Sequence, residues 1–516
     1  MKKNISALFI IFLIALIARF LFFRDSTYFG YDEARDAFIS QDIYKNLDFK
    51  IIGPPANFPG IFHGPLFWYF IGPLYILGGG NPYIVSAVFR IINALGVFIV
   101  YLIAKKLFNR PVSYFAAFIY AVSFEQTQYA MYVGNPSLAV FSFLGIFLGA
   151  VMIFKDKNYK GLILMFVSAA IAMQLEFILA YTFLVVLVLI IILRKNLKHL
   201  NKKYWLYVTI PTLLILSTFI IAEAKFGFQI TRGMLHLATS GYNVMGQEDT
   251  RFTLYAKMFA ELFQYNIFNL ARPYVYLFIL PVIFYLFFLS RKNHSARIVL
   301  VWMFSALFLL PFGGYDAFYV NVGIGVSIII ALAFILLKIA EKSKASAYIM
   351  FLVIFLSNFL LIFRYNRDGL IVQIKAQQFM KLNDEISLID KIYHYADGKG
   401  FTLRVTSMPY KVQTVWAYLF THFGQKKWGY LPYWEGEEVM GYPGHLPGPV
   451  KGTTCIRFLI REPVRGIPEV LINKDKDEEN LFSDIIKVEK IGEFLLEIRK
   501  AKGECHNLKP SVLETL

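Results

Sequence analysis

The sequence predicts an α-helical polytopic membrane protein that carries a small, outward-facing α/β domain at its C-terminal end. Of its 516 residues, 57% are hydrophobic and only 17% are charged. Apolar runs near the roughly 20 residues needed to cross a bilayer recur through residues 1–363, separated by short Lys/Arg clusters. From residue 364 to residue 516 no such run remains. We therefore expect about 11 transmembrane helices followed by a separate C-terminal domain.

The net charge of +17 raises the question of a nucleic-acid partner. The basic residues lie in clusters interrupted by apolar runs, whereas nucleic-acid-binding domains carry continuous basic surfaces. Clusters of this kind are typical of cytoplasmic loops and of contact with anionic lipids. We interpret the positive charge as a mark of cytoplasmic loops, and we expect membrane lipids, and no nucleic acid, among the partners.

The first span is residues 5–23, preceded by Lys2 and Lys3. No small-residue cleavage site follows it, so we expect a retained helix with a cytoplasmic N-terminus. An outer loop, residues 24–82, comes next. Within this loop the apolar stretch 63–79 contains two Gly-Pro pairs, and counting it as a span would place the next basic cluster outside. We therefore expect an interfacial helix there.

From residue 83 to residue 363 the remaining spans, one of them over residues 111–132, alternate between basic inner clusters and polar outer turns. The outer turns include residues 134–136, 174–176 and 313–316. An odd number of spans places the C-terminal domain outside the plasma membrane.

The C-terminal domain, residues 364–516, shows mixed patterns. Residues 377–395 predict an amphipathic helix and residues 401–408 a strand. At about 150 residues the domain is long enough to have a core of its own. Its two cysteines, Cys455 and Cys505, are compatible with a disulfide on an oxidising side or with two free thiols.

The stretch from Tyr31 to Asp36 places four ionisable groups within six residues of the outer loop. A carboxylate pair, Asp32 and Glu33, beside Arg35 can hold a base, orient it and bind an anionic leaving group near a lipid substrate. The alternative is a solvated amphipathic turn stabilised by Asp/Arg pairs.

The order of the next motifs adds to this interpretation. His63-Gly64-Pro65-Leu66-Phe67-Trp68-Tyr69 follows the acidic stretch, and Arg90 and Lys105-Lys106-Leu107-Phe108-Asn109-Arg110 come next. This ordered set, over roughly residues 1–340, resembles the polyprenyl-phosphate-dependent GT-C glycosyltransferases of the family 39 type. That group includes protein O-mannosyltransferases and the aminoarabinose transferases that modify lipid A.

The resemblance implies a sugar donor linked to polyprenyl phosphate and catalysis on the outer face of a prokaryotic plasma membrane. The family's catalytic acid falls on Asp32, with Glu33 as its neighbour. Two positions depart from the family pattern: His63-Gly64-Pro65 replaces a Lys-Pro-Pro-like sequence, and Asn135 stands where relatives often have Asp.

Sugar transfer from a polyprenyl phosphate requires a base for the acceptor hydroxyl and cations for the departing phosphate. We expect Asp32 to be that base and the anomeric centre to be inverted. The cationic candidates are Arg35, His63 and Arg90. For two of them an alternative role stays open. Arg90 would instead snorkel to the membrane interface, and His63 would instead cap the interfacial helix.

Polar residues at the outer ends of spans are candidates for substrate contact: Asn135, Gln174, Glu176, Asp316 and Tyr319. A helix-end carboxylate hydrogen-bonded to its neighbours is the alternative for Glu176. The sequence has no zinc-type spacing and no Ser/His/Asp set. No cofactor is predicted with certainty, and a divalent metal at the adjacent carboxylates stays open, because two carboxylates alone do not specify one.

We thus predict a membrane glycosyltransferase that acts on a protein, lipid or glycan acceptor. The alternative is a lipid or polysaccharide transporter or flippase, which would carry ionisable groups at mid-bilayer and broken helices in paired halves. A catalytically inactive scaffold is a further alternative, but it would not need Asp32 and Glu33.

Overall fold

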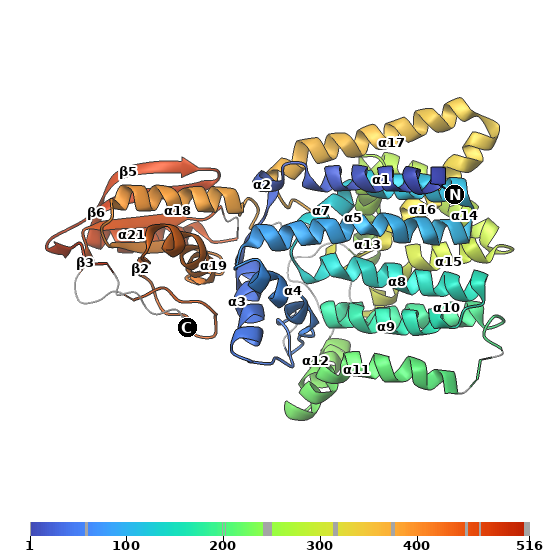
Figure 1. Cartoon of the computed structure of the whole chain (residues 1–516), viewed down its shortest axis with the longest axis horizontal. Coiled ribbons are helices and arrows are strands. Elements are labelled where there is room, and N and C mark those ends of the chain that lie inside the picture. Colours follow the sequence, from blue (N-terminus) through green and yellow to red (C-terminus); the bar gives the residue numbers. More distant parts are fainter. Residues whose placement is uncertain are drawn as a thin grey trace. The chain divides into compact units, whose positions relative to one another are not determined.

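The computed structural model describes residues 2–56, 60–198, 200–201, 203–240, 250–312, 318–372, 377–448, 453–463 and 466–509. The chain forms two compact units (Figure 1). The helical unit comprises Met1–Leu21, Phe49–Tyr69 and Ala87–Asn366, and the mixed unit comprises Phe22–Asp48, Phe70–Ser86 and Arg367–Leu516.

Within the described residues, six helices are long and apolar enough to cross a membrane (Figure 1). They are α5 (Pro82–Leu107), α8 (Asn135–Asp156), α11 (Lys203–Lys225), α14 (Arg272–Ser290), α16 (Ile324–Lys342) and α17 (Lys344–Tyr365). The other predicted spans coincide with five further helices: α1 (Lys2–Phe20), α6 (Arg110–Val122), α9 (Lys160–Leu175), α10 (Thr182–Leu193) and α15 (His294–Met303). The predicted interfacial helix is α4 (Leu66–Leu77), in which Pro73 lies.

The segment 111–132, predicted as one span, is divided into two helices. Helix α6 ends at Val122, and α7 (Phe124–Met131) begins after Ser123, whose hydroxyl accepts a hydrogen bond from the Gln126 backbone N–H at 3.2 Å. A serine in extended conformation is a favourable N-cap. The prediction of a continuous span was therefore wrong at this point.

Helices α8 and α9 pack closely because glycines face each other across their interface. A Cβ atom on Gly149 would lie 2.4 Å from the Gly161 carbonyl oxygen, and one on Gly161 would lie 2.3 Å from the Gly149 oxygen. Small residues allow helix backbones to approach in membranes, where packing replaces the hydrophobic effect as the driving force. Nearby, the rings of Phe147 and Trp302 stack at 4.2 Å.

The remaining helices of the helical unit connect these packed spans. They are α12 (Gln229–Ser240), α13 (Arg251–Asn266) and the 3₁₀ helices η1 (Phe177–Tyr181), η2 (Ser305–Phe312) and η3 (Phe318–Val320).

The mixed unit is built on a five-stranded sheet with the order β2-β1-β4-β6-β5. Strand β1 (Phe401–Thr406) is parallel to β2 (Tyr433–Trp434) and to β4 (Ile456–Arg461). Strand β6 (Phe494–Ala501) is antiparallel to β4 and to β5 (Ser483–Ile491).

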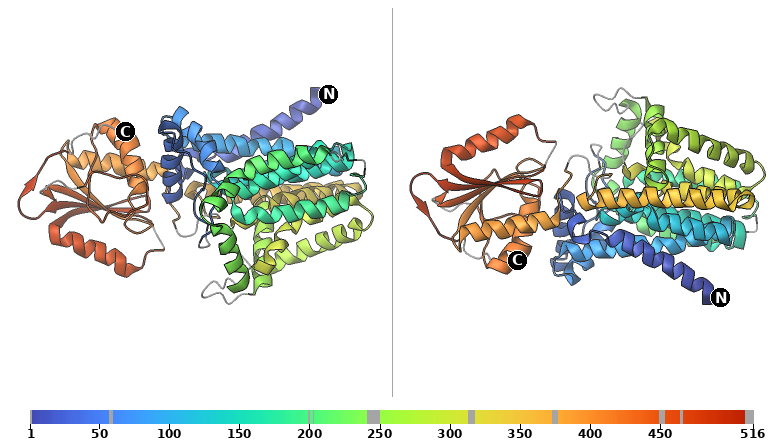
Figure 2. Two further views of the ribbon diagram at one scale, coloured as in Figure 1. Left: turned by 90° about the horizontal axis from the view of Figure 1, so that it is seen from below. Right: turned by 90° about the horizontal axis from the view of Figure 1, so that it is seen from above.

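Helices α18 (Leu382–Ala396) and α21 (Glu469–Phe482) lie on opposite faces of this sheet (Figure 2). The helix predicted over 377–395 and the strand predicted over 401–408 correspond to α18 and β1. Helix α19 (Thr414–Leu419) is followed by the single-turn π-helix η5 (Phe420–Gln425).

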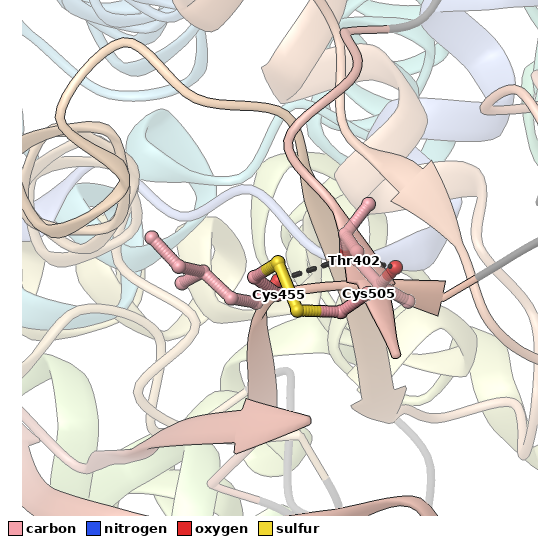
Figure 3. Close-up of a disulfide and its surroundings, with 5 residues drawn as sticks. Thr402, Cys455 and Cys505 are labelled. Carbon is pink, nitrogen blue, oxygen red and sulfur yellow. Dashed lines mark hydrogen bonds between the residues drawn. A yellow bond between two sulfur atoms is a disulfide. The ribbon is translucent and has the colours of Figure 1, made fainter. Parts of the chain in front are cut away.

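Cys455 and Cys505 form a disulfide, with Cα atoms 4.9 Å apart (Figure 3). The bond lies beside a two-stranded ladder of β3 (Thr453–Thr454) and β7 (Cys505–His506). The hydroxyls of Thr402 and Thr454 hydrogen-bond at 2.7 Å next to it. Of the two alternatives left by the sequence, the structure therefore has the disulfide.

Two segments of the predicted outer loop belong to the mixed unit, namely residues 22–48 and 70–86. Residues 27–29 pair with residues 380–382: the Phe29 N–H donates to the Met380 carbonyl at 3.0 Å and the Leu382 N–H to the Thr27 carbonyl at 2.9 Å. The domain boundaries predicted from the sequence stay a prediction, and the compact units differ from them in this assignment.

Candidate functional site

The acidic stretch forms the first turn of α3 (Tyr31–Lys45) rather than a loop. Gly30 is the N-cap, and Glu33, three residues later, accepts a hydrogen bond from the Gly30 backbone N–H at 3.0 Å. Carboxylates in the first turn also interact favourably with the helix dipole. Glu33 is 2% exposed. Its hydrogen bond to the Gly30 N–H shows that helix capping fixes the position of its carboxylate.

Asp32 presents its carboxylate at the surface of the same turn. Its side chain is 55% exposed, and its Oδ1 lies 2.6 Å from Nη1 of Arg35. Arg35 also lies 2.8 Å from Oδ1 of the buried Asp36 and 5.5 Å from the centre of the Tyr31 ring. The guanidinium thus holds Asp32 in one orientation.

Burial lowers the pKa of Arg35, but the carboxylates of Asp36 and Asp32 outweigh that effect and raise it overall. Arg35 therefore stays charged at any physiological pH. The Asp/Arg pairing expected from the alternative interpretation of this motif is present, and it leaves Asp32 accessible.

Glu33 belongs to a set of buried carboxyl groups in the mixed unit. Burial raises the pKa of Glu33 well above its usual range, and the Asp32 charge adds to the shift. Burial likewise raises the pKa of Glu385 strongly and that of Glu462 to about 7. A raised pKa favours the protonated form, which is a poor base, whereas Asp32 is exposed; the catalytic roles of both residues stay predictions.

His63, Gln174 and Glu176 are brought together in the helical unit, and their predicted roles in donor and substrate binding stay predictions. His63 Nδ1 lies 3.4 Å from Oε2 of Glu176, which follows the last residue of α9. The backbone carbonyl oxygen of Gln174 accepts a hydrogen bond from the Gly64 N–H at 2.8 Å. Its side chain donates to the Ile215 carbonyl and the Thr218 hydroxyl at 2.7 and 2.8 Å.

The Phe177 backbone N–H donates to His63 Nδ1 at 3.0 Å. Nδ1 is therefore unprotonated, and in the neutral ring the proton lies on Nε2. His63 thus accepts from the first residue of η1, which begins at Phe177, and this contact is not the cap of the interfacial helix that the sequence left open. Nε2 is a hydrogen-bond donor.

Arg90 is fully buried in the helical unit, so it does not snorkel to a surface. Its Nη1 donates to the Arg19 carbonyl oxygen near the C-terminal end of α1. This carbonyl lies in the last turn of a helix, where backbone oxygens lack an intrahelical donor. The contact gives Arg90 a structural role, and its predicted role in donor binding stays a prediction.

The sequence analysis did not single out Arg19, which is also fully buried. Its guanidinium donates to the side chain of Asn93 at 2.7 Å and to the carbonyls of Ala121 and Tyr120 at 2.8 and 3.3 Å. Both carbonyls lie where α6 ends. The sequence feature that could have identified Arg19 is its position as the single charged residue inside the first apolar run.

Helix α7 was also missed as a polar element. Glu125 Oε2 accepts hydrogen bonds from Asn266 at 2.8 Å and from Gln126 at 3.2 Å. Asn358 accepts from the Phe124 N–H at 2.9 Å. Residues 125–128 are all buried, so this polar helix connects α13 and α17 inside the helical unit. The sequence feature that could have identified this helix is the polar run Glu-Gln-Thr-Gln within an apolar segment.

Asn135 begins α8, and its buried Oδ1 has no hydrogen-bond partner among the described residues. Tyr319 lies in η3, next to Phe318. The Tyr129 hydroxyl donates to the Phe318 carbonyl at 3.0 Å, and the Tyr132 and Phe318 rings are 5.6 Å apart. These contacts bring the turn at Asn135 and η3 to one end of the helical unit. The predicted site residue Asp316 lies outside the described residues.

In the described ranges, no group of three or more His, Cys, Asp or Glu side chains is placed to hold a metal ion. Asp32 and Glu33 have different partners, Arg35 and the Gly30 N–H. A divalent metal at this pair therefore receives no support from the geometry.

Comparison with known proteins agrees with the sequence interpretation. Residues 62–221 match the model of a family described as dolichyl-phosphate-mannose-protein mannosyltransferase. No curated protein matches the sequence. The crystal structure of ArnT from Cupriavidus metallidurans bound to undecaprenyl phosphate is similar, with a TM-score of 0.58 and 10% identity, over 95% of this chain and 97% of that one.

Two structures of an Archaeoglobus fulgidus oligosaccharyltransferase were also found. The apo form has a TM-score of 0.46 at 13% identity, over 81% of this chain and 64% of that one. The complex of AglB with an inhibitory peptide and a dolichol-phosphate has a TM-score of 0.44 at 13% identity, over 83% and 64%.

The similarity to ArnT extends over nearly the whole of both chains and confirms the predicted fold class, a helical GT-C-like membrane protein with a small C-terminal sheet domain. The matched segment 62–221 includes His63, Arg90, Asn135, Gln174 and Glu176. Together these findings confirm the predicted resemblance to GT-C glycosyltransferases, and they support a membrane glycosyltransferase.

Proposed function

We propose that this protein transfers a sugar from a polyprenyl-phosphate-linked donor to an acceptor hydroxyl at the outer face of the plasma membrane. The observation that carries the proposal is the geometry of Asp32, an accessible carboxylate held by Arg35 on the first turn of α3. The family-model match and the shared fold support the donor class, because the matched family and ArnT are described with dolichyl-phosphate-mannose and undecaprenyl phosphate.

In the proposed reaction, the acceptor oxygen attacks the anomeric carbon while the carboxylate of Asp32 takes the hydroxyl proton. The bond between the anomeric carbon and the phosphate oxygen breaks, and polyprenyl phosphate leaves with the bonding electrons. Attack opposite the leaving group inverts the anomeric configuration. Arg35 orients Asp32 throughout.

The departing phosphate requires donors and positive charge. His63 carries a ring proton on Nε2, the nitrogen opposite the one that Phe177 occupies, and could donate it to a phosphate oxygen. Arg35 and Arg90, also proposed for the donor phosphate, already bind protein groups: two carboxylates in one case and the Arg19 carbonyl in the other. His63 binds protein groups as well, so all three side chains stay candidates for the donor phosphate.

We place the N-terminus in the cytoplasm and the C-terminal domain outside, because of the Lys/Arg bias along the chain. The disulfide between Cys455 and Cys505 supports this orientation, since disulfides persist in oxidising compartments. A protein, lipid or glycan acceptor would then be met on the outer side.

The transporter alternative is favoured by one specific observation. Buried polar groups at the α6/α7 break, together with Arg19 and Arg90, are the kind of feature that lines transport pathways. In this protein both arginines donate to backbone carbonyls, and Arg19 also donates to the Asn93 amide, which indicates helix bracing instead.

The test is sugar transfer or release from radiolabelled polyprenyl-phosphate hexoses in proteoliposomes. Asp32→Asn should abolish it, whereas Asp42→Asn, a control on the same helix, should keep wild-type activity. Normal turnover by Asp32→Asn would refute the base assignment. No turnover by wild type across varied donors and acceptors, with lipid flipping observed in the same vesicles, would favour the transporter.

A further inference from the structure

The mixed unit contains a second site of interest at the carboxyl ends of its parallel strands. A cavity of about 200 Å³ is lined by Arg404 from β1, Trp434 from β2, Asp475 and Glu478 from α21, and by Lys411 and Glu435. Ligands of α/β sheets commonly bind beyond the carboxyl ends of parallel strands. Nothing in the transfer reaction proposed above uses these residues.

The side chains around the cavity are held in place by the fold. Arg404 and Thr406 are two residues apart on β1 and therefore point to the same face of the sheet, toward α21. Arg404 Nη1 lies 2.7 Å from Glu478 Oε2, and the Thr406 hydroxyl donates to Asp475 Oδ2 at 2.8 Å. The Tyr410 hydroxyl donates to the other oxygen of Asp475 at 2.7 Å. A ligand would thus meet preorganised groups.

The charges of the lining select the class of ligand. Two cations, Arg404 and Lys411, stand against four carboxylates, those of Glu435, Glu437, Asp475 and Glu478. An anionic ligand such as a phosphate would meet net repulsion. Carboxylate oxygens are acceptors only, so they suit a ligand rich in hydroxyl or amino donors.

Trp434 supplies the complementary donor. It is 4% exposed, and its indole N–H has no hydrogen-bond partner among the described residues. A Cβ atom on Gly436, which also lines the cavity, would lie 2.7 Å from this nitrogen, so a side chain at position 436 would press against the indole N–H. Buried indole N–H groups normally find an acceptor, and leaving one unpaired is unfavourable.

We propose that this cavity binds a single neutral or amino-bearing sugar unit, whose hydroxyl oxygen accepts from Trp434 and whose hydroxyl or amino groups donate to the carboxylates. The cavity is smaller than the roughly 300–1,000 Å³ pockets that hold drug-sized ligands, so it accommodates one ring and not an extended glycan. Sugar binding itself is independent of transfer. The further assignment, that the bound unit belongs to a glycan acceptor, rests on the proposed function.

The full-length protein, purified in a detergent without a sugar headgroup, would be titrated with D-mannose, D-glucose and D-glucosamine and followed by saturation-transfer NMR. At least one sugar should bind. Trp434→Phe keeps the ring but removes the N–H, and should weaken binding about fivefold to tenfold. Gly436→Ala should weaken it as well. Trp428→Phe is the matched control, because Trp428 donates to Asp390 and does not line the cavity.

The proposal is overturned if none of the three sugars binds at tens of millimolar, or if Trp434→Phe and Gly436→Ala, both verified as folded by their melting temperatures, bind like wild type. Displacement of the sugar by inorganic phosphate would overturn it too, because the cavity would then be an anion site. The Asp32→Asn variant should retain sugar binding. Loss of transfer without loss of binding therefore separates failure of one proposal from failure of the other.

Discussion

Arg19 offers the sharpest test of how the helical unit is held together. Replacing Arg19 with Met keeps an unbranched apolar stem of similar length and removes the guanidinium. That group donates to the Asn93 side chain and to the Ala121 and Tyr120 carbonyls, at distances of 2.7 to 3.3 Å. The substitution therefore unpairs acceptors from two helices, α5 and α6, at once.

The size of the expected loss of stability follows from the burial of Arg19 and its partners. Arg19 is fully buried, and the Asn93 side chain is 2% exposed, so water does not readily replace the lost donors. Each hydrogen bond to a charged donor contributes about 1.5–3 kcal/mol, and a buried orphan acceptor costs about 1–3 kcal/mol. Removing the buried charge recovers part of this loss, because its desolvation is no longer needed. We expect a net destabilisation of about 3 kcal/mol.

The assay is thermal unfolding of the purified protein in detergent, followed by helix content. Arg19→Met should lower the melting temperature by several degrees relative to wild type, and Arg24→Met, an exposed neighbour, should leave it unchanged. An Arg19→Met protein that melts with wild type would show that these hydrogen bonds contribute no net stability and would refute the reasoning.

Three further predictions address other parts of the molecule. Arg90→Gln should lower the melting temperature, because it removes the guanidinium that donates to the buried Arg19 carbonyl; a variant that melts with wild type would show that this contact adds no stability. Glu462, buried with its pKa raised to about 7, stays protonated in the folded state while the unfolded chain ionises, so stability of the mixed unit should fall by roughly 3 kcal/mol from pH 4.5 to pH 7 and then level off. Glu462→Gln should flatten this pH dependence of the unfolding free energy, with the exposed Glu469→Gln as control, and an unchanged slope would count against it. The Cys455→Ser/Cys505→Ser variant should lose about 2–4 kcal/mol through the larger entropy of the unfolded chain, and equal denaturant midpoints for variant and wild type would contradict this.

Local patterns in the sequence predicted much of the fold. The spans α5, α8, α11, α14, α16 and α17 follow from hydrophobic length. The interfacial helix α4 was predicted because Lys/Arg bias forbade a span there. In the mixed unit, α18 and β1 followed from periodicity. All of these depend on residues that are close in sequence.

The errors and omissions have a common cause. The break at Ser123 depends on partners far along the chain, since the Ser123 hydroxyl donates to Asn266 and the Phe124 N–H donates to Asn358. Arg19 looked like an interruption in an apolar run until α6 placed two helix-end carbonyls beside it. Glu33 looked equivalent to Asp32, but capping turned it inward. Such differences arise from tertiary contacts and cannot be read from spacing.

The sequence alone determined that the protein is a polytopic membrane protein with an acidic motif after its first apolar segment and a distinct C-terminal domain, because composition, hydrophobic length and charge bias act locally. Only the tertiary structure decided that Asp32 is accessible while Glu33 is buried, that His63 meets Glu176, and that Cys455 bonds to Cys505. Burial and pairing decide which carboxylate can take a proton, and both depend on residues brought together from distant parts of the chain.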